Sequence, residues 1–210
     1  MSCTLQLAEQ LKAMKVVPVI AIKDADHAVA LAKTLIENGL PCAEVTFRTA
    51  AAGEAIRRMR EAYPEMLIGS GTVLTKAQVD ESIEAGVNFI VTPAFNPDVV
   101  AYCLEKNMPV VPGTNNPSTV DQAYSMGLRM VKFFPAEASG GIAMLKSLSA
   151  VYPMTFMPTG GISENNIGQY LAQSCVAACG GTWMVPGDLI DAQNWDEIGR
   201  LVRQAVAALQ

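Results

Sequence analysis

The sequence predicts an α/β fold: a single (β/α)8 barrel of the TIM-barrel class, preceded by an extra N-terminal helix. Eight short, apolar, β-branched segments alternate with amphipathic helical segments, which is typical of a parallel sheet covered by helices. The segments begin at intervals of about 20 to 27 residues, enough for one strand, one helix and two short loops. No linker divides the chain, so we expect one domain over residues 1–210, with residues 1–15 packing on the barrel as the extra helix.

The expected strands share a run of apolar or β-branched residues bounded by turn residues. In order they are VVPVIAI from Val16, AEVTF from Ala43, LIGSGTV from Leu67, FIVTP from Phe89, PVVPGT from Pro109, MVKFFP from Met130, TFMPTGG from Thr155 and AACGGTWM from Ala177. An open doubly wound sheet is the alternative arrangement of such units. A dinucleotide-binding version of it has no support, because no GxGxxG follows any strand.

Capping residues support the helical segments between these strands. A polar residue that can accept a backbone N–H bond precedes each of several apolar-periodic segments, in some cases directly before proline at the first helical position. These residues are Asp24, Thr75 in the pattern Thr75-x-x-Gln78, Asn96 before Pro97, Asn116 before Pro117, and Asn194 in Asn194-x-x-Glu197. The sequence therefore predicts helices that begin at these positions.

Composition argues against several classes of partner. Half of the residues are hydrophobic, and the formal net charge is −5. An acidic chain without a basic run is not expected to bind nucleic acid or an anionic membrane surface. No apolar stretch approaches the roughly 20 residues that span a bilayer, and no signal-peptide pattern opens the sequence. We therefore expect a cytoplasmic protein.

The residues that commonly bind metals are few. The chain has five cysteines at irregular spacings and one histidine. This inventory argues against a Cys/His zinc site and favours free thiols in a reducing compartment. We expect neither a metal nor another cofactor.

Two charged residues lie inside expected strands. Lys132 interrupts the apolar run MVKFFP, and Glu44 interrupts AEVTF. A buried, unpaired ammonium group is costly or loses its proton, and a neutral lysine amine is a nucleophile. A structural Lys–Glu ion pair is the alternative interpretation, although such a pair often adds no stability over apolar residues. Because strand side chains alternate, both residues can face the barrel interior.

Glycine pairs and an arginine mark the expected mouth of the barrel, where the C-terminal strand ends meet. PTGGIS contains Gly160 and Gly161, and CGGTW contains Gly181 and Thr182. They fall on the seventh and eighth expected strands, whose loops frequently bind phosphate through backbone N–H groups. Arg48 follows the second strand and can hold a carboxylate with two hydrogen bonds. A surface position at the start of a helix is equally compatible with Arg48.

In this order and at these spacings, VVPVIAI, EVTFRT, GSGTVLT, VKFFPAEASGG, PTGGIS and GGTW resemble one enzyme family. It comprises the 2-keto-3-deoxy-6-phosphogluconate (KDPG) and 4-hydroxy-2-oxoglutarate (KHG) aldolases, the short class I aldolases of the Entner–Doudoroff type. The resemblance covers the chain from about Val16 onward. It implies a (β/α)8 barrel, a homotrimer, and cleavage of KDPG to pyruvate and D-glyceraldehyde 3-phosphate. Cleavage of KHG to pyruvate and glyoxylate is a further implied activity.

The resemblance also implies roles for individual residues. Lys132 matches the Schiff-base lysine and Glu44 the general acid and base, so the lysine supplies its own electrophile. The matching substrate-binding residues are Arg48 and Thr72 for the carboxylate, Pro93 and Phe134 beside the pyruvate moiety, Thr159, Gly160 and Gly161 at the mouth, and Gly161, Gly181 and Thr182 for the phosphate. Thr182 stands where the family commonly has serine, a change that keeps the hydroxyl.

Other functions remain open at this stage. The nearest is an aldolase for an epimeric or non-phosphorylated 2-keto-3-deoxy acid. A phosphosugar isomerase or epimerase would use a metal or a pair of carboxylates, whereas this chain has Lys132. A phosphosugar-binding sensor would keep the glycine pairs but would need neither Lys132 nor Glu44.

Overall fold

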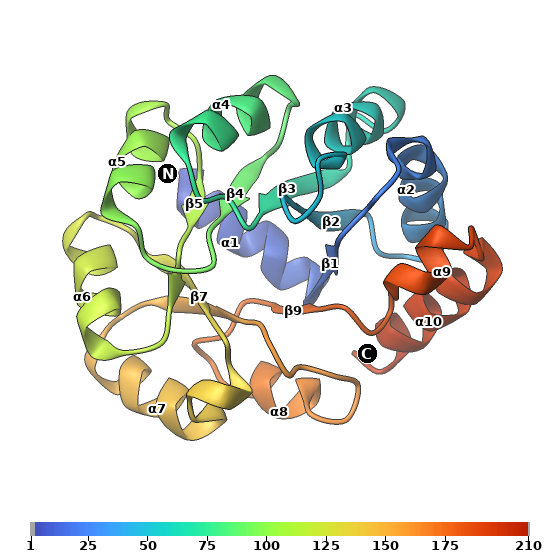
Figure 1. The fold of residues 1–210 in the computed structure, drawn as a ribbon. Helices are drawn as coiled ribbons and strands as arrows, with labels where there is room; N and C mark the ends of the chain where they lie inside the picture. Colours follow the sequence, from blue (N-terminus) through green and yellow to red (C-terminus); the bar gives the residue numbers. More distant parts are fainter. Residues whose placement is uncertain (1–2, 210) are drawn as a thin grey trace.

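The computed structural model describes the backbone of residues 3–209 and the side chains of residues 6–209. Within that range short parallel strands lie inside a ring of helices (Figure 1). The strands are β1 Val16–Ile20, β2 Cys42–Thr46, β3 Leu67–Gly71, β4 Phe89–Val91, β5 Val110–Val111, β6 Gly113–Thr114, β7 Met130–Phe133, β8 Thr155–Pro158 and β9 Cys179–Gly181.

The prediction of a closed (β/α)8 barrel is wrong. The hydrogen-bonded strands form two separate parallel sheets, a six-stranded one in the order β5-β4-β3-β2-β1-β9 and a three-stranded one in the order β6-β7-β8. The fifth expected strand is divided into β5 and β6 at Pro112, which has no N–H to donate. Between β8 and β9 the pairing is reduced to two isolated bridges, Phe156 with Val176 and Thr159 with Gly180. Pro158, beside the second bridge, also lacks a donor.

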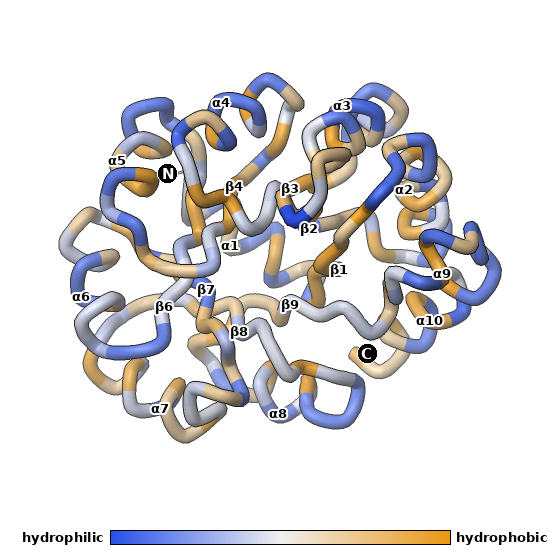
Figure 2. The backbone as a smooth tube through the Cα atoms, in the orientation of Figure 1, coloured by the Kyte–Doolittle hydropathy of each residue, from blue (hydrophilic) through white to orange (hydrophobic). Residues whose placement is uncertain are grey.

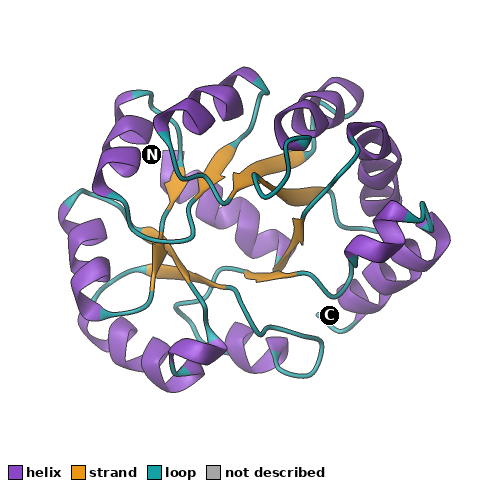
Figure 3. Cartoon of the chain, viewed as in Figure 1, coloured by secondary structure: helices purple, strands orange, loops and turns teal. Residues whose placement is uncertain are grey.

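The helices surround the strands on their outer side (Figure 3). In the described chain they are α1 Cys3–Met14, α2 Ala28–Glu37, α3 Ala52–Ala62, α4 Lys76–Glu84, α5 Pro97–Glu105, α6 Pro117–Ser125, α7 Gly141–Val151, α8 Ile167–Leu171, α9 Gly187–Asp191 and α10 Trp195–Ala207, with 3₁₀ turns η1 Ala25–His27 and η2 Glu137–Ser139. The extra helix α1 does not belong to the ring. It packs against β1 and β7 and crosses behind the strands in Figure 1.

The predicted capping residues hold the helix starts. The side chains of Asn96 and Asn116 accept backbone N–H bonds at the first turns of α5 and α6. The Thr75 hydroxyl accepts from the Gln78 N–H at 3.2 Å, but the Gln78 side chain accepts from Leu74 rather than from Thr75. Asp24 caps the 3₁₀ turn η1, which leads into α2, so that α2 starts four residues after its predicted cap.

The strands are buried on both faces, which accounts for their apolar sequences. Residues of β7 alternate, so that Val131 and Phe133 are fully buried while Lys132 lies on the opposite face. Hydrophobic residues follow the strands and the inner helix faces, and hydrophilic residues follow the outer helix faces (Figure 2).

No helix in the described part of the chain combines the length and the apolar character that crossing a membrane requires.

Candidate active site

One cavity of about 280 Å³ gathers every site residue that the sequence predicts. They arrive from strands of both sheets and from the loops that follow them. The predicted residues on its wall are Glu44, Arg48, Thr72, Pro93, Lys132, Phe134, Thr159, Gly160, Gly161, Gly181 and Thr182, and four further residues complete the wall, Val19, Thr46, Ile162 and Gly180. Predicted positions that range from Glu44 to Thr182 in the sequence thus share one cavity.

Lys132 and Glu44 form an ion pair at the floor of this cavity. The Lys132 Nζ donates to the Glu44 Oε1 at 3.1 Å. Glu44 is fully buried and Lys132 is 5% exposed, so water barely screens the pair. Glu44 lies on β2 of the six-stranded sheet and Lys132 on β7 of the three-stranded sheet, so their side chains meet across the space between the sheets.

The chain leaves room for the Glu44 carboxylate. A Cβ atom on Gly71, which lies on the adjacent strand β3, would stand 2.3 Å from the Glu44 Oε1. Only glycine therefore fits beside this carboxylate. The second oxygen, Oε2, is buried and has no hydrogen-bond partner within the described residues. A buried acceptor without a partner is costly to keep, and here it is available to a bound molecule.

Aromatic and polar groups surround the lysine amine. The Phe134 ring centroid lies 5.2 Å from the Lys132 Nζ, within the range of a cation–π contact. The hydroxyl of Thr159, elsewhere on the cavity wall, is buried and has no hydrogen-bond partner among the described residues. The amine itself stands between an aromatic face and a carboxylate that keeps one unused acceptor oxygen, which suits a reacting group better than a structural ion pair.

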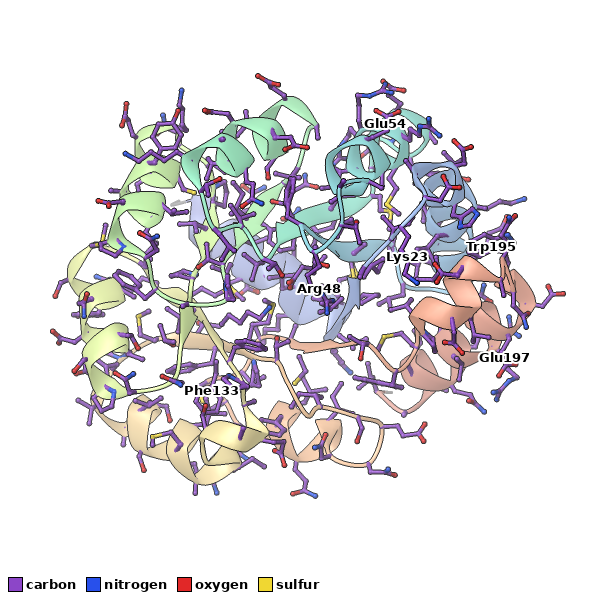
Figure 4. All side chains as sticks on the ribbon, viewed as in Figure 1. Lys23, Arg48, Glu54, Phe133, Trp195 and Glu197 are labelled. Atoms are coloured by element: carbon purple, nitrogen blue, oxygen red, sulfur yellow. The ribbon has the colours of Figure 1, made fainter. Side chains whose placement is uncertain are left out.

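Arg48 is held in place by Thr46, a residue that the sequence analysis missed. The Arg48 Nε donates to the Thr46 Oγ1 at 3.0 Å, and this hydroxyl donates to the carbonyl of Ile20 at 2.7 Å. No other partner of the Arg48 guanidinium occurs in the described chain, so its terminal nitrogens are open to an anion. Figure 4 shows Arg48 near the middle of the ring of helices. Thr46 lies two residues after Glu44, so the two-residue strand period was the signal that could have identified it.

Thr72 has an unusual backbone conformation. Its φ is 55°, in the left-handed region that β-branched residues rarely adopt. Such strain persists where the surroundings impose it, and it is concentrated at functional sites. Here the strained residue directly follows β3, and its side chain lies on the cavity wall.

Two glycine-containing loops close the opposite side of the cavity. Gly160 and Gly161 follow β8 with φ values of 96° and 78°, conformations that glycine adopts without strain. Gly181 ends β9, and Thr182 follows it. The N–H of Gly161 has no acceptor among the described residues, which leaves a backbone donor for an anion at this end.

No group of three His, Cys, Asp or Glu side chains arranged to hold a metal ion occurs among the described residues. His27, the one histidine, lies at the end of η1 with its ring 6.0 Å from that of Trp195, away from the cavity wall.

A comparison with protein families agrees with this geometry. The family model described as KDPG and KHG aldolase matches residues 7–201. The chain belongs to the KDPG and KHG aldolase family. The resemblance drawn from the sequence motifs is thereby confirmed, and the protein is a carbon–carbon lyase of the aldolase type.

Relatives in this aldolase family match almost over their whole length. A 2-dehydro-3-deoxy-phosphogluconate aldolase of Haemophilus influenzae is 50% identical over 204 residues, which is 97% of this chain and 96% of the relative. A KHG/KDPG aldolase of Escherichia coli is 41% identical over 192 residues, covering 91% of this chain and 90% of the relative.

Solved aldolase structures are similar in fold. A KDPG aldolase of Legionella pneumophila, with pyruvate captured as a covalent carbinolamine intermediate, superposes with a TM-score of 0.91 at 37% identity, covering 94% of this chain and 97% of the other. A KDPG aldolase of Zymomonas mobilis with 3-phosphoglycerate has a TM-score of 0.86 at 34% identity and covers 94% of each chain.

Proposed function

We propose that the protein is a class I aldolase that cleaves KDPG to pyruvate and D-glyceraldehyde 3-phosphate, with Lys132 as the Schiff-base residue. The observation that carries this proposal is the buried lysine amine 3.1 Å from a fully buried carboxylate, inside a cavity with anion donors at both ends. The carbinolamine in the Legionella pneumophila relative supports the same chemistry here.

In the first step Glu44 accepts a proton from the paired Lys132 ammonium, and the neutral Nζ attacks the C2 carbonyl of the substrate. A C–N bond forms, the carbonyl oxygen takes a proton, and the carbinolamine then loses water to give a protonated imine. Glu44 is placed to exchange the protons of these steps because its Oε1 already contacts the amine.

In the second step the imine accepts the electron pair of the C3–C4 bond. Glu44 takes the proton of the C4 hydroxyl, directly or through a water molecule, and the C4 fragment leaves as the aldehyde. An enamine of pyruvate remains on Lys132. Protonation at C3 and hydrolysis of the imine release pyruvate and restore the free amine, so the cycle balances without an external electron acceptor.

The anion donors fit the two ends of such a substrate. Arg48 and Thr72 serve the carboxylate beside the reacting carbon, and Pro93 and Phe134 enclose the pyruvate moiety. Thr159 and Gly160 line the passage, while Gly161, Gly181 and Thr182 serve the phosphoryl group. The Zymomonas mobilis relative with 3-phosphoglycerate supports a phosphate-bearing ligand.

A second candidate substrate is KHG, which would give pyruvate and glyoxylate. The description of the matched family and the Escherichia coli relative both include this activity. KHG carries a carboxylate in place of the phosphorylated end, so the same reacting groups serve it while the phosphoryl donors contribute less.

Borohydride trapping tests the proposal. The protein is incubated with pyruvate, reduced, and mapped by peptide mass spectrometry, and KDPG cleavage is followed by pyruvate release. We expect a pyruvate adduct on Lys132 that is lost in Lys132→Ala and retained in Lys146→Ala, a lysine outside the cavity wall. An adduct scattered over surface lysines, or none, would leave a phosphosugar isomerase or a binding protein as the explanation to test.

The assembly is proposed from the family resemblance alone. We infer a homotrimer, with a mass near three times the 22.3 kDa of one chain, to be measured by light scattering. A cytoplasmic location stays a prediction.

A further inference from the structure

Glu137 belongs to the motif FPAEASGG, yet it is not on the wall of the cavity. It begins η2, directly after the strand that carries Lys132 and the loop that carries Phe134. Glu137 is exposed to solvent, and nothing in the reaction described above uses its carboxylate.

Backbone hydrogen bonds join the segment around Glu137 to the glycine turn that follows β8. The N–H of Ala136 donates to the Thr159 carbonyl at 2.8 Å, and the N–H of Glu137 donates to the Gly160 carbonyl at 3.1 Å. These two bonds tie the segment after β7 to the turn after β8.

The Glu137 stem also supports Gly161 directly. A Cβ atom on Gly161 would stand 2.6 Å from the Glu137 Cγ and 2.7 Å from its Cβ. The Gly161 backbone thus packs directly on these methylene groups, and a residue with a Cβ atom at position 161 could not approach them as closely. On its other side, the Asn166 side chain donates to the Gly161 carbonyl at 2.9 Å.

Tyr170 fixes the end of the Glu137 side chain. Tyr170 lies on α8 and is fully buried, and its hydroxyl donates to the Glu137 Oε1. The buried Tyr170 hydroxyl would be costly to leave without a partner. Its bond to Glu137 therefore holds an otherwise solvent-facing carboxylate in one position.

We propose that Glu137, anchored by Tyr170, is a positioning residue that holds the Thr159–Gly161 turn in the shape that receives the phosphoryl end of the substrate. The inference rests on the proposed function, since it assigns a task within the same site. It separates two ends of the cavity. Lys132 and Glu44 act on the pyruvate end, and among the described residues neither side chain is hydrogen-bonded to Glu137. The turn after β8 contributes to the distal end. Loosening the turn therefore weakens recognition of the phosphoryl group and leaves Schiff-base formation intact.

The test compares substrates that differ at the distal end. In Tyr170→Phe the KM for KDPG is expected to rise about tenfold, the loss typical of a charge-assisted hydrogen bond, with a smaller change in kcat. KM for KHG and the rate of pyruvate trapping on Lys132 should change less than twofold. Glu137→Ala should reproduce this pattern, and Glu137→Gln, which keeps an oxygen acceptor for the Tyr170 hydroxyl, should restore most of the KDPG affinity.

Tyr102→Phe is the matched control. The Tyr102 hydroxyl donates to the Asp80 carboxylate at 2.9 Å in another part of the fold. This variant therefore measures the effect of losing a tyrosine–carboxylate bond that has no link to the turn. Equal losses on KDPG and KHG in the Tyr170 variant, or a pattern like that of Tyr102→Phe, would overturn the inference. A wild-type protein without any Lys132 adduct would instead contradict the proposed function. Should Tyr170→Phe fail to fold, the variants of the exposed Glu137 decide the question.

Discussion

Glu44 and Lys132 lie 88 residues apart in the chain, and their side chains meet at 3.1 Å between the two sheets. Each comes from a strand whose other residues are almost all apolar. Desolvating two charges costs several kcal/mol, and a buried pair recovers this cost only when it is well bonded. Here the Glu44 Oε2 is left without a partner in the described chain, so the pair is not optimised for stability.

The first prediction follows from that imbalance. Removing one partner leaves an unpaired buried charge, so Lys132→Met alone is expected to lower the free energy of unfolding by about 3–5 kcal/mol. The double variant Lys132→Met with Glu44→Leu should recover most of this loss while remaining unable to form a pyruvate adduct. Urea denaturation gives the stabilities. A double variant as unstable as the single one would show that the ion pair is structural.

Gly71 provides a second prediction. A methyl group there would meet the Glu44 Oε1 at 2.3 Å and push the carboxylate from the lysine. Gly71→Ala should therefore lower the rate of KDPG cleavage by at least about tenfold and destabilise the fold by about 1–3 kcal/mol, as overpacking does. Gly168→Ala is the control, because a Cβ atom at Gly168 has no neighbour within 4 Å. Normal turnover in Gly71→Ala would contradict the placement of Glu44 as the proton carrier.

Strand positions were predictable because they are encoded locally. The apolar runs that begin at Val16, Leu67 and Met130 start β1, β3 and β7 as expected. Closure of the sheet was not predictable from these runs, because it depends on hydrogen bonds between strands of two to four residues. Pro112 and Pro158 remove donors at the two places where the ladder is interrupted, and the spacing between strands carries no signal of that effect.

The residues on the cavity wall were easier to predict from the sequence than the residues that hold them in place. Lys132 stands out as a charge in an apolar strand, and the glycine pairs stand out by composition. Tyr170 carries no such signal, since a tyrosine in a helix is ordinary, and Thr46 is marked only by its place two residues after Glu44 on the same strand. Their tasks, holding Arg48 and Glu137, depend on contacts between distant segments that only the folded chain brings together.

The strained backbone of Thr72 leads to the third prediction. Relief of its left-handed conformation should make Thr72→Gly more stable than Thr72→Ser by about 1 kcal/mol, since serine keeps the strain and glycine does not. The order of activity should be the reverse, because serine keeps a hydroxyl for the substrate carboxylate. Thermal melts and the KM for KDPG measure the two effects. Equal KM values in both variants would exclude the hydroxyl from substrate binding.

Buried thiols give the fourth prediction, a loss of stability at alkaline pH. Burial raises the pKa of the Cys179 thiol to about 12, whereas an unfolded cysteine ionises near pH ~8.5. Above that lower value the unfolded chain releases a proton that the folded chain retains, so the free energy of unfolding falls as pH rises. The stabilisation from the protonated Cys179 thiol is fully present below pH ~8.5. Above that pH it declines by up to about 1.4 kcal/mol per pH unit, until the pKa of the folded state is reached.

Burial also raises the pKa of Cys42 and Cys103, so their effects add to the slope in the same direction. Cys179→Ala isolates one contribution: its stability should fall less steeply between pH 9 and 10.5 than that of the wild type, by about one proton. Val176→Ala also removes buried side-chain atoms nearby but no titrating group, so it should lower stability at every pH and leave the slope unchanged. Urea denaturation midpoints measured across this pH range test the prediction. If stability falls equally steeply with pH in Cys179→Ala and in the wild type, the Cys179 thiol ionises equally in the folded and unfolded chains.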